Sequence, residues 1–335
     1  NTLRNLIGDS IAGFGKQLAS SSWAALLGGL SMVLARTEDE VVVQVILKAY
    51  ENTIFVLGTV GLETPRDAFL TSLCKFATPL PPQPQQPQPG QAATPQKGKQ
   101  APEAEAFDDR PVITQKCVEA IKTLMSVVHC LGNVLGGGWK IALQAVEAAS
   151  RAIAVHAPGG SEESDIVIAS QAMASMFEST LLLDTDSTVV MFSELARLSA
   201  RALPADEPAG VEPPNSFFLK KVIETAHLNV TRIDKLWQPL RDHALFVSKN
   251  PAPVIREMVV GSLAELALEA LSGTAAAAQK SPLVCAPPLA SPQEAVVAMQ
   301  VPFVRLLEDI MAASPFADTR AKVLESAHRV VQTTG

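Results

Sequence analysis

The sequence predicts an all-α protein built as a solenoid of about six helical hairpins. Apolar residues make up 47% of the 335-residue chain, whereas aromatic residues make up only 5%. This composition favours helices, because β-sandwiches and barrels rely on β-branched and aromatic residues. Between proline-rich breaks, apolar side chains recur every three or four residues, which is the helical period. The helices form pairs of about forty residues, a size typical of HEAT and armadillo repeats, so the expected fold is a HEAT/armadillo-like α-solenoid.

The predicted hairpins follow one another along the chain. Their ranges are 2–36, 38–77, 111–156, 164–203, 216–272 (three helices) and 292–334. In the 38–77 pair, Thr64 supplies an N-cap hydroxyl before Pro65, which predicts a helix start there. Gly136–Gly138 is expected to be the turn of the 111–156 hairpin, with Trp139 opening its second helix.

The helix expected to begin at Pro253 illustrates the periodic pattern. Its apolar stripe includes Ile255, Val259 and Leu263. Arg256 lies off this stripe, and a charged residue in such a position is expected to face water.

A proline- and glutamine-rich stretch divides the chain. Pro79–Pro102 holds eight of the 24 prolines, seven glutamines and no aromatic residue. Such a segment buries too little apolar surface to become ordered, so residues 79–110 are predicted to be a disordered linker. It separates N-terminal helical repeats at 1–78 from further repeats of the same solenoid at 111–335.

Composition and charge also limit the functions that the chain can have. The net charge is −7, whereas nucleic-acid-binding domains are normally basic, so nucleic acid is not an expected partner. The longest uncharged run is Gln17–Ala35, and its apolar core Trp23–Ala35 has 13 residues. A membrane span needs about 20 apolar residues, so this run is predicted to be a buried helix.

No residue pattern points to catalysis, a cofactor, a metal ion or a small-molecule substrate. The five histidines show no metal-binding spacing. In Gly136–Gly138, Trp139 stands where a phosphate-binding loop needs lysine, so the glycines fit a turn better. The strongest basic cluster is expected on one helix and forms a candidate interaction surface for an acidic partner or a phospholipid head group. Such clusters are usually solvated helix faces, and this is the favoured explanation of the four residues. The members of the cluster are Lys220, Lys221, Arg232 and Lys235.

Three stretches carry a family resemblance. They are Glu63–Ala77 (ETPRDAFLTSLCKFA), Leu131–Leu143 with its long turn before Trp139, and Phe218–His243 with Trp237 near its end. In this order they resemble the region downstream of the Sec-seven domain in large Arf exchange factors. Together with the closing V-V-Q-x-x-G, they resemble more closely the Mon-two (monensin-sensitivity) Golgi scaffold family, which lacks the exchange domain. The motif residues are expected to be structural, as a helix-cap charge pair and as packing between helices: Arg66, Asp67, Phe69, Trp139, Trp237 and His243.

The resemblance implies a noncatalytic scaffold at the cytosolic face of the trans-Golgi network and endosomes, acting in endosome-to-Golgi and vacuolar vesicle traffic. It implies protein partners such as a Dopey-type scaffold, an Arf-like small GTPase or a flippase. Because the chain is acidic overall, direct membrane binding is expected to be weak or absent. The alternative is a regulatory downstream segment of a true large Arf exchange factor.

Overall fold

The computed structural model describes residues 2–79, 113–155, 163–203, 216–280 and 292–332. Within these ranges the chain forms twelve α-helices and three short 3-10 helices, and no β-strand. The predicted all-α fold is therefore confirmed. The predicted linker at 79–110 lies, apart from Pro79, outside the described residues, so the division of the chain at this point stays a prediction.

The chain forms two compact units. The first holds Asn1–Ser126 and Gln144–Met173, and the second holds Val127–Leu143 and Ala174–Gly335. The helices of the first half are α1 (Thr2–Arg36), α2 (Glu40–Thr59), α3 (Glu63–Ala77), α4 (Gln115–Leu131), α5 (Gly138–Val155) and α6 (Glu163–Glu178). Those of the second half are α7 (Thr185–Ala202), α8 (Phe217–Leu228), α9 (Ile233–Val247), α10 (Pro253–Lys280), α11 (Pro292–Ala313) and α12 (Ala317–Gln332).

Helices α2 and α3 form a closely packed hairpin in the first unit. Gly61 turns the chain with a positive φ of 69°, a conformation that glycine adopts without a Cβ clash. Across the hairpin, the rings of Tyr50 and Phe69 meet edge to face at 5.5 Å, and both side chains are fully buried. The Tyr50 hydroxyl hydrogen-bonds Ser72 Oγ at 2.9 Å, so the one polar atom of this aromatic pair has a partner.

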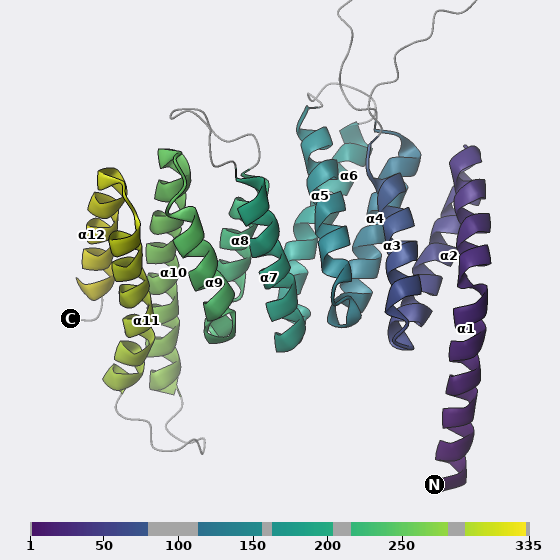
Figure 1. Cartoon of the computed structure of the whole chain (residues 1–335), viewed down its shortest axis with the longest axis horizontal. Coiled ribbons are helices and arrows are strands. Elements are labelled where there is room, and N and C mark those ends of the chain that lie inside the picture. Colours follow the sequence, from purple (N-terminus) through teal and green to yellow (C-terminus); the bar gives the residue numbers. More distant parts are fainter. Residues whose placement is uncertain (1, 80–112, 156–162, 204–215, 281–291, 333–335) are drawn as a thin grey trace, which may run out of the picture. The chain divides into compact units, whose positions relative to one another are not determined.

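In the second unit, helices α7 to α12 lie side by side (Figure 1). α10 packs against both α11 and α12, and α7 packs against both α8 and α9. The core between them is aliphatic and aromatic, with Phe192 and Phe303 almost completely buried. Pro239 lies inside α9 and Pro302 inside α11, where each lacks the N–H that a helix interior normally uses.

Two predicted helix boundaries are wrong. Residues 2–36 form one 35-residue helix rather than a hairpin. The hydroxyls of Ser21 and Ser22 both donate to the carbonyl of Leu18 in their own helix, so they do not interrupt it. Helix α3 begins at Glu63, one residue before the expected cap Thr64, and its N-cap Leu62 makes no side-chain cap hydrogen bond.

The expectation of a buried, short apolar run near residue 17 is also wrong. Because the helix continues through the serines, Gly13–Arg36 reaches the length and composition of a membrane span. Its mean hydropathy is 1.5, and only 6% of its apolar window is buried in the protein. Glu40–Thr59 and Gln115–Val134 meet the same criteria but are 39% and 56% buried. Three described helical segments are thus long and apolar enough to cross a bilayer, on length and composition alone.

Candidate functional site

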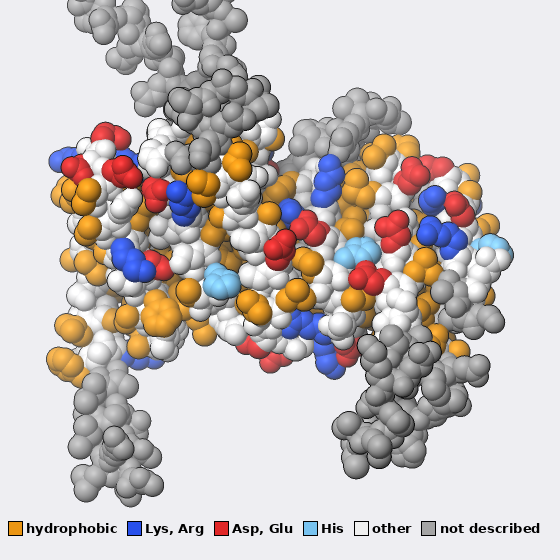
Figure 2. Space-filling view, turned by 180° about the vertical axis from the view of Figure 1, so that it is seen from behind, with side chains coloured by type: hydrophobic (Ala, Val, Ile, Leu, Met, Phe, Trp, Pro, Cys, Tyr) orange, Lys and Arg blue, Asp and Glu red, His pale blue; other side chains and the backbone are white. Residues whose placement is uncertain are grey.

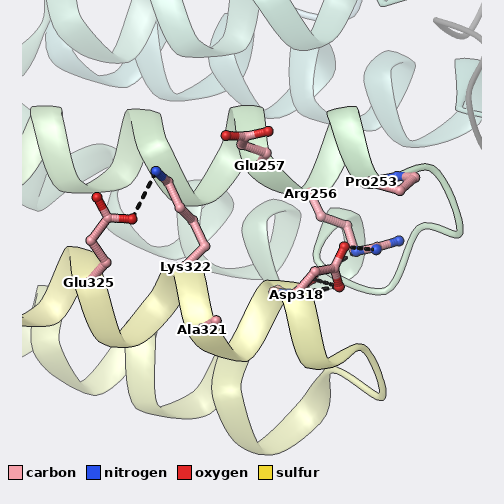
Figure 3. Close-up of a pocket in the computed structure, with 8 residues that line it drawn as sticks. Pro253, Arg256, Glu257, Asp318, Ala321, Lys322 and Glu325 are labelled. Carbon is pink, nitrogen blue, oxygen red and sulfur yellow. Dashed lines mark hydrogen bonds and ion pairs between the residues drawn. The ribbon is translucent and has the colours of Figure 1, made fainter.

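A hollow of about 310 Å³ lies between α10 and α12 in the second unit (Figure 3). Its lining is mostly charged, and Figure 3 shows Lys322 pointing to Glu325 at one end while Arg256 and Asp318 meet at the other. The eight lining residues are Pro253, Arg256, Glu257, Asp318, Thr319, Ala321, Lys322 and Glu325.

Arg256 is the buried centre of this region, with only 3% of its surface exposed. Its Nε donates to Thr319 Oγ1 at 2.7 Å, and its Nη1 donates to the carbonyls of Asn250 and Pro251 at 2.8 and 2.7 Å. Nη2 pairs with the Asp318 carboxylate, and the guanidinium stacks on the Phe316 ring at 3.7 Å. The side chain therefore ties the start of α12 to the loop before α10.

The electrostatics of Asp318 follow from the same contact. Burial would raise the pKa of its carboxyl, but hydrogen bonds from the Thr319 backbone N–H and from Arg256 outweigh it and lower the pKa. At the other end of the hollow, Lys322 pairs with Glu325 at 3.1 Å on the surface of α12. Because the guanidinium hydrogen bonds run to protein acceptors, this arrangement serves best as a clamp between helices.

Sequence reasoning placed Arg256 on a solvated face, and this expectation is wrong. A second stripe of α10 contains Val260, Ala264 and Ala267, all buried, and Arg256 starts that stripe one turn earlier. The spacing of four between Arg256 and Val260 was the available signal. The acceptors that make burial tolerable come from α12 and the loop before α10, and the local pattern does not reveal them.

The predicted basic cluster does not lie on one helix. Lys220 and Lys221 lie in α8, Arg232 ends the 3-10 turn Val230–Arg232, and Lys235 lies in α9. Lys221 pairs with Glu224 and lies 4.6 Å from the centre of the Phe177 ring, while Lys235 pairs with Asp234. Figure 2 shows Lys and Arg side chains interspersed with Asp and Glu on the face it presents.

Arg232 is turned inward. Its Nη1 donates to the Leu183 carbonyl at 2.7 Å, its Nη2 donates to the Thr180 carbonyl, and both Nε and Nη2 donate to Asn229 Oδ1. Asn229 is fully buried and donates from Nδ2 to Thr180 Oγ1 at 2.9 Å. These bonds reach one carbonyl of the 3-10 turn Ser179–Leu182 and the carbonyl of Leu183 that follows it, so Arg232 braces a loop rather than extending a basic surface.

The first resemblance motif contributes to the first unit. Arg66, which is 3% exposed, contacts Asp67 through Nε and Nη2, each at 2.8 Å from Oδ1. The expected charge pair is present, within α3 rather than across its N-cap. Phe69 completes the edge-to-face contact with Tyr50 described above.

The aromatic motif residues lie between helices of the second unit. Trp139 is 1% exposed, and its Nε1 donates to the carbonyl of Gly132 at 3.1 Å, closing the turn before α5. A Cβ at Gly132 would come within 2.3 Å of Leu183 Cδ2, so the half-buried Leu183 side chain would have to move to admit a larger residue. Trp237, which is half-buried, meets the Phe303 ring edge to face at 4.9 Å.

His243 lies on the inner face of α9. Burial lowers its pKa from 6.5 to about 4, and its Nε2 has no hydrogen-bond partner among the described residues. The imidazole is therefore neutral at physiological pH.

The described cysteines and the other possible metal ligands show no reactive or metal-binding arrangement. Burial raises the pKa of both Cys74 and Cys117 to about 12, so these thiols stay protonated. Cys130 is exposed. Across the described ranges, no group of three His, Cys, Asp or Glu side chains is arranged to hold a metal ion.

Comparisons with known proteins identify relatives. No protein-family model matches the chain. The chain is 28% identical over 294 residues to the Protein MON2 homolog of Xenopus laevis and 26% identical over 302 residues to that of Homo sapiens. Each alignment covers 75% of this chain and 17% of the relative, so the chain spans about a sixth of the length of these proteins.

More distant matches follow. The brefeldin A-inhibited guanine nucleotide-exchange protein 3 of Arabidopsis thaliana is 22% identical over 316 residues, covering 74% of this chain and 16% of that protein. A solved structure described as a computational design of self-assembling cyclic homo-oligomers shares 11% identity at a TM-score of 0.27, a likeness too slight to bear on the fold. The sequence likenesses relate this chain to the MON2 family, with the brefeldin A-inhibited exchange proteins as more distant relatives.

Proposed function

We propose that this chain is a scaffold segment of a protein of Golgi and endosome traffic, and that it acts through protein–protein contacts without catalysing a reaction. The observation that carries the proposal is the likeness to MON2 homologues from three animals, at 26–28% identity over about three-quarters of the chain. The likeness to the exchange proteins is weaker, at 22–24%. The proposed location is the cytosolic face of the trans-Golgi network and endosomes.

The contacts of the resemblance motifs support a framework role. Arg66, Trp139 and Arg232 each donate hydrogen bonds to neighbouring protein groups. Residues used in this way fix the angles between helices, which is how a helical-repeat protein sets the shape of the surface it offers to partners.

The proposed partners are those that the resemblance implies: a Dopey-type scaffold, an Arf-like small GTPase or a flippase. Of the basic residues, the exposed Lys220 and Lys235 remain as candidate contacts for an acidic protein surface. Because Lys235 pairs with Asp234 and the chain carries a net charge of −7, attraction to anionic lipid is expected to be weak.

Affinity purification of the tagged chain from cell extract, read by mass spectrometry, tests this proposal. A Dopey-type scaffold, an Arf-like GTPase or a flippase should be enriched over a matched Lys220→Glu, Lys235→Glu double variant with the same helix content. If both forms recover the partners equally, the two lysines do not take part in the contact. Recovery of none of the three partners would contradict the proposed partner set.

A second candidate is a regulatory segment of an Arf exchange factor. It is favoured by the match to the Arabidopsis thaliana exchange protein, which covers 74% of this chain. Release of a fluorescent GDP analogue from an Arf-like GTPase, with the full-length protein added, separates the two. The scaffold proposal expects the intrinsic release rate, whereas strong acceleration would favour the exchange-factor reading.

A further inference from the structure

We draw no further inference here: the strongest candidate, the apolar surface patch that Phe14, Leu18 and Met32 form on the open face of α1, carries none, because nothing in the described residues shows whether a bilayer, another helix or a second copy of the chain covers it.

Discussion

Helices α1 and α12 expose very different surfaces. On α12 the buried positions Thr319, Val323 and Val330 follow one narrow stripe, and the rest of the helix is largely charged or polar. On α1 most exposed positions are apolar or small, and the charged residues among those described are Lys16 and Arg36. A helix that faces water needs a polar outer side, whereas a helix inside a stack of repeats needs two apolar sides. The exposed side chains therefore show that the outer side of α12 suits water, whereas much of the open side of α1 is apolar.

The largest expected effect contrasts two tryptophans. Trp139 is buried and hydrogen-bonded to Gly132 in the second unit, whereas Trp23 is half-buried on α1. Trp139→Ala should lower the free energy of unfolding by about 3–5 kcal/mol, because it leaves a large cavity and an unpaired carbonyl. Trp23→Ala should cost about 1 kcal/mol in the isolated chain. Urea unfolding followed by circular dichroism measures both, and similar losses would mean that α1 is packed as tightly as the second unit.

The clamp between α10 and α12 should be nearly as sensitive. Arg256→Ala removes the hydrogen bonds to Asn250 and Thr319 and leaves buried acceptors without donors, so a loss of about 3 kcal/mol is expected. The matched control Arg305→Ala, on the exposed side of α11, should change stability by less than about 0.5 kcal/mol. If the two variants unfold at the same urea concentration, Arg256 does not hold α12 in place.

The stability of the region around His243 should depend on pH, whereas that of α1 should not. His243 is neutral when folded because its pKa is about 4, whereas in the unfolded chain its pKa is near 6.5. Its contribution is therefore fully present above pH 6.5 and is lost as the pH falls towards 4, by about 3 kcal/mol in all.

Hydrogen exchange measured at pH 7 and pH 5 can locate this loss. Protection in α9 and the helices packed on it should fall at pH 5 relative to α1, which contains no histidine. His243→Leu should flatten the dependence in this window. An unchanged pH profile in that variant would show that another group is responsible.

The smallest expected effects come from two glycines. In the isolated chain, Gly28→Ala should stabilise α1 by about 1 kcal/mol, because the new methyl group meets no atom and alanine favours the helix. Gly132→Ala should instead destabilise the second unit by about 1 kcal/mol, because its methyl group would force the half-buried Leu183 side chain to move. Thermal unfolding shows whether each substitution raises or lowers the stability. A destabilising Gly28→Ala in the isolated chain would mean that α1 is already covered.

The sequence predicted the helices well because a helix is recorded locally, in the spacing of apolar residues. The pairs α2–α3, α4–α5 and α6–α7 fall close to their predicted ranges, and the chain turns at Gly136 before Trp139 as expected. The long α1 was missed because its serines were read as a helix start. In the structure Ser21 and Ser22 bond within the helix, and a local pattern does not distinguish the two uses.

The candidate site was less predictable, because the role of a charged residue depends on distant acceptors. Arg232 was expected on a basic surface, but carbonyls from residues 180 and 183 turn it inward. Arg256 was expected to face water, but it is buried and donates hydrogen bonds to Thr319 and to the Asn250 carbonyl. In both cases the residue type and its position were visible in the sequence, whereas its partners lie 49 to 63 residues away or in a neighbouring loop.

By itself, the sequence determined the helical class, the approximate hairpins and the likeness to the MON2 family, since each depends on residue types and their order along the chain. Only the tertiary structure decided which faces are covered. It showed that Arg256 is buried, that Arg232 braces a turn, and that the face of α1 with Phe14, Leu18 and Met32 is open. The physical reason is that burial depends on two surfaces, the side chain's own and the one that packs against it. The same apolar stripe is part of the core when a partner helix covers it and an exposed surface when none does.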